Sequence, residues 1–326
     1  MKCTNKILPV ILFLFIFIFT GCGNTKYEIP YAVDSNISSF RMSTSSNTYH
    51  ARVDSFAAKL CVADTDINPS SVGLEPDGCA ALFSLNSRNT IYAENIHARM
   101  HPASLTKIMT AIVAKKNASP DMLLTATPGS VITDPSAQII GLKAGDQMTL
   151  EQALNIMLVY SANDVALLIA EGVGGSVENF VNMMNEEALK LGATNTHFTN
   201  PHGLTDDEHY TTGYDLYLML NEAVQYDLIK QIIGVPSYQT TYYDQAGNAV
   251  EVDVKNTNFY LIDKAKAPAG VTVAGGKTGT TSIAGHCLVL YAKDNSNNPY
   301  ISIVMKASSR DLLYDEMNDV LKNIGN

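Results

Sequence analysis

The chain has 326 residues, of which 46% are hydrophobic and 17% are charged, a composition typical of a globular protein with a full core. This length is enough for one large domain or two small ones. The formal net charge is −10. A charge of that sign argues against a nucleic-acid backbone as partner.

The first 22 residues are predicted to be a signal peptide. Lys2 and Lys6 precede the apolar run 7–19, which is shorter than the roughly 20 residues that a membrane-spanning helix needs. Small residues then precede Cys22, an arrangement that resembles a bacterial lipobox, whose cysteine is lipidated and becomes the new N-terminus. We therefore expect a lipid on Cys22 to hold the protein at the outer face of the bacterial cytoplasmic membrane. The alternative is a plain signal peptide that happens to contain this cysteine.

Residues 23–50 are predicted to form a flexible linker, because residues 34–48 are mostly Ser, Thr and Asn and offer little to bury. The folded domain is expected to span residues 51–326.

Three cysteines remain in the predicted domain. Cys287 lies in an apolar strand pattern and is expected to be a small buried hydrophobe. Cys61 and Cys79 lie on neighbouring predicted strands outside the cytoplasm, which leaves a disulfide open without fixing it.

Apolar spacing predicts an α/β fold, with strands near both ends of the domain and helices between them. This order indicates one sheet with flanking helices and a helical lobe. The predicted strands are residues 56–64, 79–85, 90–93, 271–277, 285–292 and 300–306. The predicted helices are one that begins at Ser104 and those over residues 150–160, 162–171, 177–191, 214–224 and 312–324.

The first candidate motif is Ser104-Leu105-Thr106-Lys107, at the start of a predicted helix. Residues three apart lie on the same side of a helical turn. The lysine amine, if burial or a nearby cation keeps it neutral, can act as the base that activates the serine hydroxyl. Backbone N–H groups at the helix N-terminus can stabilise an oxyanion. Alternatively, Ser104 is a helix N-cap and Lys107 is solvated.

The second candidate motif is Ser161-Ala162-Asn163, between two predicted helices. As a pattern it is weak, since Ser-x-Asn occurs five times in the chain. The Ser161 hydroxyl is a candidate for relaying a proton to a leaving group, and the Asn163 amide can serve the substrate or Lys107. An N-cap role for Ser161 is the alternative.

The third candidate motif is Lys277-Thr278-Gly279, which ends an apolar strand. Glycines on and before the motif let a ligand backbone approach closely. Lys277 and Thr278 are expected to recognise a carboxylate, and a second ammonium near Lys107 is expected to lower its pKa. A solvated lysine at the end of a flexible glycine-rich hairpin is the alternative.

In this order, the three motifs resemble those of the penicillin-recognising serine enzymes, and in particular the serine-type D-Ala-D-Ala carboxypeptidases. Residues 200–204 match the same family. The resemblance implies an antiparallel sheet with helices, and an active site between the sheet and the helical lobe. It implies Ser104 as nucleophile, Lys107 as base, Ser161 and Asn163 on the lobe side, and Lys277, Thr278 and Gly279 on the strand side. The backbone N–H groups of Ser104 and Thr280 would form the oxyanion hole, and Arg310 would help to hold the substrate carboxylate.

The resemblance also implies the partners of the protein. These are a peptidoglycan stem peptide that ends in D-Ala-D-Ala, and β-lactams as covalent inhibitors. No cofactor or metal is expected, since the histidine pairs lack a His-Glu-x-x-His arrangement. Family members often carry an aromatic residue or His where Thr280 stands, and many continue into a C-terminal β-rich domain that is not expected here.

Three alternatives of the same fold remain open: a D,D-endopeptidase, a β-lactamase and a non-catalytic β-lactam sensor. A β-lactamase needs a carboxylate that positions water, and no acid lies between Glu187 and Asp206. A sensor would not need all three motifs.

Overall fold

The computed structural model describes residues 57–68, 72–133 and 137–325. The predicted signal peptide, Cys22, the linker and the predicted domain start at residue 51 lie outside these ranges. The chain divides into two units, Met1–Ala58 and Lys59–Asn326, and the fold described here is that of the second unit.

A five-stranded antiparallel sheet forms the centre of this unit. Its strands lie in the order β2-β1-β9-β8-β7, so the N-terminal hairpin pairs with the last strand of the chain. The prediction of an antiparallel sheet made from both ends of the domain is confirmed. The strands are β1 (Cys79–Ser84), β2 (Asn89–Glu94), β7 (Val271–Thr281), β8 (Gly285–Asp294) and β9 (Pro299–Ala307).

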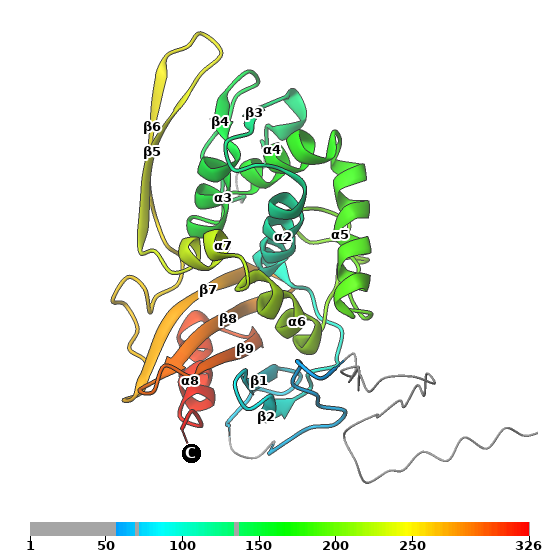
Figure 1. The fold of residues 1–326 in the computed structure, drawn as a ribbon, viewed down its shortest axis with the longest axis vertical. Helices are drawn as coiled ribbons and strands as arrows, with labels where there is room; N and C mark the ends of the chain where they lie inside the picture. Colours follow the sequence, from blue (N-terminus) through cyan, green and yellow to red (C-terminus); the bar gives the residue numbers. More distant parts are fainter. Residues whose placement is uncertain (1–56, 69–71, 134–136, 326) are drawn as a thin grey trace, which may run out of the picture. The chain divides into compact units, whose positions relative to one another are not determined.

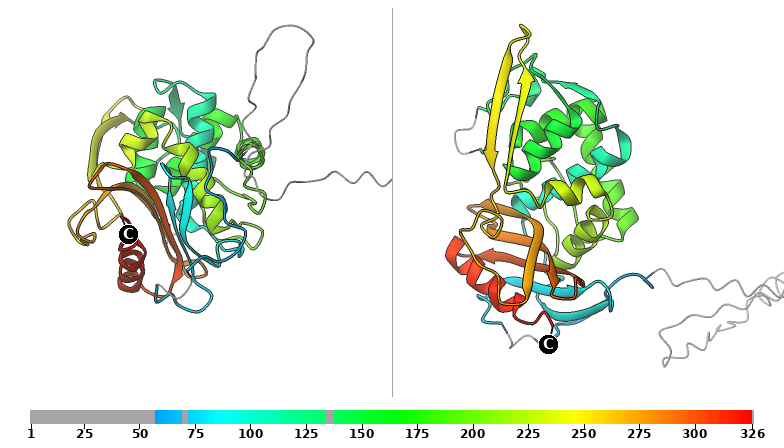
Figure 2. Two further views of the ribbon diagram at one scale, coloured as in Figure 1. Left: turned by 60° about the horizontal axis from the view of Figure 1, so that its bottom comes forward. Right: turned by 60° about the vertical axis from the view of Figure 1, so that its left-hand side comes forward.

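Helices cover both faces of this sheet, which gives three layers (Figures 1 and 2). Successive side chains on a strand point to opposite faces. On β8, Leu288 and Leu290 pack into a core with Met317 of helix α8 (Arg310–Leu321), while Val289 belongs to the core shared with the helical lobe. The sheet therefore separates two hydrophobic cores, and β7 forms its edge beside the lobe.

The helical lobe has the helices that the apolar spacing predicts, to within three residues at each end. Its first helix is preceded by a 3₁₀ turn over Ala103–Thr106, and a short helix, α7, was not predicted. The helices are α2 (Lys107–Asn117), α3 (Leu150–Val159), α4 (Asn163–Gly174), α5 (Val177–Leu191), α6 (Gly213–Ala223) and α7 (Asp227–Ile232).

A second, four-stranded sheet on the lobe was not predicted from the sequence. Its order is β3-β4-β5-β6, and β5 and β6 form a long hairpin at the side of the lobe (Figures 1 and 2). The residues after β6 return the chain to the edge of the main sheet. The strands are β3 (Leu123–Thr125), β4 (Gln147–Thr149), β5 (Ser237–Tyr243) and β6 (Ala249–Lys255).

The prediction of a strand over residues 56–64 is wrong for the described residues of that range, which form turns and irregular backbone. The side chains of α6 satisfy this backbone in place of a neighbouring strand: Tyr217 accepts a hydrogen bond from the N–H of Cys61 at 2.8 Å, and Tyr214 donates one to its carbonyl at 2.8 Å. Cys61 and Cys79 are buried free thiols, so the disulfide that the sequence left open is not formed. Cys287 is buried, as predicted.

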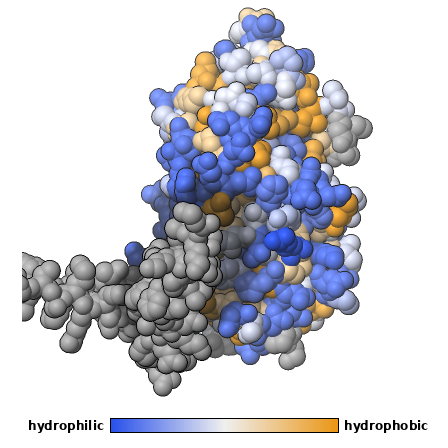
Figure 3. All heavy atoms as spheres, turned by 90° about the vertical axis from the view of Figure 1, so that its right-hand side faces the viewer, coloured by the Kyte–Doolittle hydropathy of each residue, from blue (hydrophilic) through white to orange (hydrophobic). Residues whose placement is uncertain are grey.

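Hydrophilic residues predominate on the side of the molecule seen in Figure 3, with hydrophobic residues scattered among them. Within the described ranges, none of the helices has both the length and the apolar character that a membrane crossing requires.

Candidate active site

The turn that carries Ser104 has a strained backbone held by buried partners. Ala103 has a φ of +48°, a conformation that costs a residue with a side chain about 1 kcal/mol or more. Gly203 packs against its carbonyl so closely that a Cβ at Gly203 would lie 1.8 Å from the carbonyl oxygen. The Thr106 hydroxyl donates a hydrogen bond to the same oxygen at 2.8 Å. The main-chain position of Ser104 is thus fixed by contacts on the residue before it.

The side chain of His209 forms a hydrogen bond with the hydroxyl of Thr106. Its Nδ1 accepts a hydrogen bond from the N–H of Thr199 at 3.0 Å, which leaves Nε2 as the donor to the Thr106 hydroxyl at 2.8 Å. Burial lowers the pKa of His209 to about 4, so the imidazole is neutral at neutral pH. The chain His209–Thr106–Ala103 is therefore an ordered hydrogen-bond relay beneath the Ser104 turn.

Lys107 is completely buried and points at the Ser104 hydroxyl. Its Nζ lies 2.9 Å from Ser104 Oγ, 2.7 Å from Asn163 Oδ1 and 2.7 Å from the carbonyl oxygen of His202. A neutral amine has two N–H donors and one lone pair. The two carbonyl oxygens take the donors, so the lone pair is left for the hydroxyl proton of Ser104.

The surroundings favour this neutral form. Burial, and then the positive charge of Lys277, hold the pKa of Lys107 well below its ordinary value, while the Asp164 carboxylate acts in the opposite direction. Asp164 is itself buried and accepts N–H hydrogen bonds from Ile140, Gly141 and Leu142. The Asp164 carboxylate therefore holds the loop over residues 140–142 beside the site.

Ser161 has a φ of +72° and a hydroxyl that accepts a hydrogen bond from Lys277 Nζ at 2.8 Å. It does not cap the following helix, whose N-cap is Ala162 without a side-chain bond. The N-cap alternative for Ser104 is also wrong, because the 3₁₀ turn and α2 show no side-chain cap from it. Both hydroxyls instead contact buried lysines.

Lys277 is buried near the centre of β7, and burial lowers its pKa to about 7. The alternative of a solvated lysine is therefore wrong. Farther along the strand, Gly279 lets β7 approach the nucleophile turn: a Cβ there would lie 2.9 Å from the carbonyl oxygen of Pro102 and 3.1 Å from the backbone nitrogen of Ser104. This contact places the backbone of Thr280 beside Ser104.

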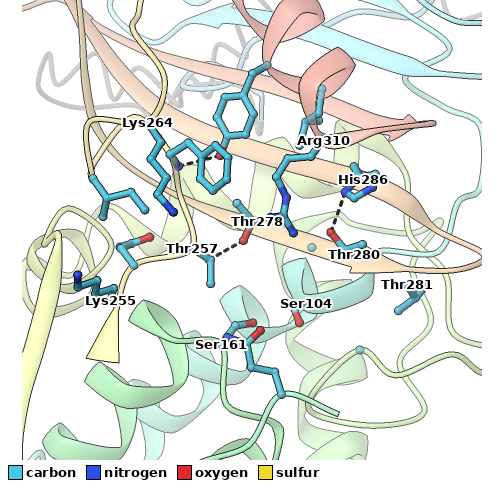
Figure 4. Close-up of a pocket in the computed structure, with 18 of the residues that line it drawn as sticks. Ser104, Ser161, Lys255, Thr257, Lys264, Thr278, Thr280, Thr281, His286 and Arg310 are labelled. Carbon is cyan, nitrogen blue, oxygen red and sulfur yellow. Dashed lines mark hydrogen bonds between the residues drawn. The ribbon is translucent and has the colours of Figure 1, made fainter. Parts of the chain in front are cut away.

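A cavity of about 500 Å³ is lined by Ser104, Ser161 and Asn163 and continues past Thr278. Figure 4 shows Ser104 and Ser161 on one side, with Thr278, Thr280 and Arg310 opposite. The hydroxyl groups of Thr278 and Thr257 lie 2.5 Å apart, and Thr280 contacts His286 at 3.2 Å. In the part of the chain that the structure describes, no Asp or Glu lines this cavity.

The structure brings together all nine residues that the sequence nominated for the site. Cys22 lies outside the described residues. The sequence reasoning missed Thr257, His209 and Asp164, and gave no individual role to Gly203. Only Gly203 carried a signal, since it lies within the 200–204 segment that matches the family; the others become visible through long-range contacts. Residues that could hold a metal, in groups of three or more, do not occur among the described residues.

A three-layered α/β domain with a serine–lysine pair between its sheet and a helical lobe defines a serine enzyme of the penicillin-recognising class. Residues 77–309 match the family described as D-alanyl-D-alanine carboxypeptidase, Peptidase S11. The chain belongs to this family.

Relatives and solved structures agree with that assignment. The chain is 33% identical over 237 residues to "D-alanyl-D-alanine carboxypeptidase DacF" of Bacillus subtilis, covering 71% of this chain and 57% of the relative. It is 30% identical over 230 residues to DacA of Haemophilus influenzae, covering 69% of this chain and 55% of that one. The match therefore spans little more than half the length of these relatives. The crystal structure of the Streptomyces K15 DD-transpeptidase superposes with a TM-score of 0.69 at 25% identity, covering 79% of this chain and 98% of that one.

Proposed function

We propose that this protein is a serine D-Ala-D-Ala carboxypeptidase that trims peptidoglycan stem peptides through an acyl-enzyme on Ser104. The observation that carries the proposal is the contact of 2.9 Å between Ser104 Oγ and the buried amine of Lys107. A serine needs an adjacent base to become a nucleophile, and this base is the side chain whose surroundings favour its neutral form.

Acylation follows from the geometry of the pair. Lys107 takes the hydroxyl proton as Ser104 Oγ bonds to the carbonyl carbon between the two D-alanines. The oxyanion is held by the backbone N–H groups of Ser104 and Thr280. The proton reaches the leaving nitrogen through the hydroxyl of Ser161, which Lys277 orients at 2.8 Å. The C–N bond then breaks, D-Ala leaves and an ester on Ser104 remains.

Deacylation uses the same groups in reverse order of proton transfer. Lys107 takes a proton from water, the water oxygen bonds to the ester carbon, and the proton returns to Ser104 Oγ as the ester bond breaks. Protein side chains, backbone amides and water supply every proton and electron pair in this sequence, so no cofactor is needed.

Recognition of a free C-terminus rests on the strand side of the cavity. The hydroxyl of Thr278 and the guanidinium of Arg310 face the cavity opposite Ser104 (Figure 4), and Lys277 adds a buried donor. A carboxylate next to the scissile amide matches these groups in charge and reach. A β-lactam offers a strained amide and a carboxylate in similar geometry, so it is expected to acylate Ser104 and to leave slowly, because its amine stays tethered.

Among the described residues, the lack of a carboxylate lining the cavity argues against the β-lactamase alternative, which needs one to position water. The intact serine–lysine pair argues against a non-catalytic sensor. A D,D-endopeptidase would use the same chemistry on a longer leaving group.

Release of D-Ala from Nα-acyl-Lys-D-Ala-D-Ala by the domain without its first 50 residues tests this function. The proposal predicts release that is lost in Ser104→Ala. Failure of the unaltered domain to release D-Ala, with folding shown by circular dichroism, would refute it.

We further propose that Cys22 is lipidated and anchors the enzyme at the outer face of the cytoplasmic membrane. The support is the basic start, the apolar run and the small residues before the cysteine. Cys22→Ala is expected to release the protein from membranes or to leave an uncleaved precursor. A variant that stays membrane-bound and is processed normally would contradict the anchor.

A further inference from the structure

The cavity does not end where the substrate's terminal carboxylate would bind. Beyond Thr278 it is bounded by the segment between β6 and β7, which contributes Thr257, Phe259 and Lys264. If the leaving group were a single D-Ala, this part of the cavity would contact no substrate atom. Its chemistry therefore bears on what the leaving group can carry.

This end of the cavity is cationic although the protein is acidic. Lys255, Lys264 and Arg310 line the cavity, and no carboxylate does so in the described ranges. Within these ranges no carboxylate oxygen lies within 4.0 Å of the charged nitrogens of these three residues. In a chain with 32 acidic and 22 basic residues, three cations that surround one cavity without an acidic partner among the described residues indicate an anionic ligand.

The charged groups of Lys264 and Arg310 both lie against the same aromatic ring, that of Phe259. Lys264 Nζ lies 5.2 Å from the centroid of Phe259, and Arg310 Cζ lies 5.3 Å from it, distances typical of cation–π contacts. The two charges therefore lie no farther apart than the sum of these distances. In Figure 4, Thr278 and Thr257 lie between Lys264 and Arg310.

The segment that carries Lys264 is an ordered part of the site. Phe259 stacks on Tyr314 of α8 with ring centroids 5.1 Å apart, and its N–H donates to the Tyr314 hydroxyl at 2.8 Å. The carbonyl of Phe259 accepts hydrogen bonds from the N–H groups of Lys264 and Ala265 at 3.0 and 3.2 Å. Lys264 thus sits on a closed turn anchored to the helix that carries Arg310.

We propose that Lys264, with Phe259 and Thr257, forms a second anion subsite that takes a further carboxylate on the leaving group, beyond the one held by Thr278 and Arg310. The inference rests on the proposed function, since it extends the substrate class of the same site. It makes the enzyme selective for leaving groups that carry two anionic groups.

Paired synthetic peptides test the subsite. The probes are Nα-acetyl-Lys-D-Ala-D-Glu and Nα-acetyl-Lys-D-Ala-D-Gln, which differ in the charge of one side chain of nearly the same shape. We expect kcat/KM to favour the D-Glu peptide by about two- to fivefold at low salt, the range of a solvent-exposed ion pair. Added salt should reduce this preference.

Lys264→Gln is expected to abolish the preference and to leave release from the D-Ala-D-Ala peptide within about twofold of the unaltered enzyme. The matched control is Lys266→Gln, an exposed lysine two residues away that does not line this cavity; it should keep the preference.

Three results would overturn the subsite: no preference in the unaltered enzyme, equal loss in both variants, or a preference that survives Lys264→Gln. A Lys264-dependent preference for a peptide with Nα-succinyl in place of Nα-acetyl would put the anion on the acyl side and would also overturn it. Failure of the proposed function is distinguishable, because then the D-Ala-D-Ala peptide itself would not be cleaved and both proposals would fall.

Discussion

Burial of Lys277 makes a specific prediction about stability against pH. Its pKa is about 7 in the folded protein, whereas an exposed lysine in an unfolded chain has a pKa of about 10.4, so the unfolded chain binds more protons between these two values. Stability must therefore rise as pH rises through this window. Lys277→Met keeps an unbranched side chain of similar length and removes the titration.

The size of the effect follows from the pKa. Each pKa unit corresponds to about 1.36 kcal/mol. Because Lys277 is half titrated at about pH 7, integration between about pH 7 and pH 9 gives a gain of about 2 kcal/mol in the free energy of unfolding. The unaltered protein should show this gain relative to Lys277→Met, and the variant should be the more stable protein at pH 7.

Urea unfolding at a series of pH values measures this difference. Subtracting the two profiles removes the contributions of the tyrosines and cysteines, which both proteins share. Lys266→Met, at an exposed position, is the control and should follow the unaltered protein. Parallel profiles for the unaltered protein and Lys277→Met would show that Lys277 does not titrate in this range, and would refute the reasoning.

Further substitutions test the remaining parts of the site. Lys107→Arg keeps the charge but cannot give up a proton; penicillin acylation should fall by several orders of magnitude, and retention of more than about a tenth of the rate would assign the base elsewhere. Thr106→Val removes the hydroxyl that bonds to the Ala103 carbonyl and should slow acylation about tenfold or more, because Ser104 is misplaced. Thr211→Val removes another buried hydroxyl and is the control: both variants should lose roughly 1 kcal/mol of stability, but Thr211→Val should keep the acylation rate. Equal acylation rates in the two variants would count against a positioning role for Thr106. Gly279→Ala pushes β7 away from the nucleophile turn. The acylation rate should therefore fall by a larger factor than the equilibrium constant for folding does, and a normal acylation rate would show that the turn tolerates the shift.

The sequence was sufficient to locate the catalytic elements because each motif lies on, or directly beside, an element with clear apolar spacing. Leu105, Ile108 and Met109 are buried as the helical spacing predicts, which fixes the direction of the helix that bears Lys107. The apolar run that ends at Lys277 likewise predicts a strand. The family resemblance then supplied the order in which these elements meet.

What the sequence did not reveal depends on contacts between distant segments. His209 meets Thr106 across 103 residues, and nothing in the local pattern around either residue signals that pairing. The hairpin β5–β6 is a different case, because β6 carries a local signal that the prediction overlooked: Val250, Val252 and Val254 alternate with charged residues, as in a half-buried strand. The described residues of the 56–64 segment show the opposite failure, since the backbone of Cys61 bonds to the Tyr214 and Tyr217 side chains of α6 in place of a neighbouring strand.

The mass of the intact protein after exposure to penicillin tests the central claim most directly. The account predicts a stable one-to-one adduct that peptide mapping places on Ser104 and that is absent in Ser104→Ala. Absence of an adduct in the folded, unaltered protein, or an adduct on another residue, would contradict it.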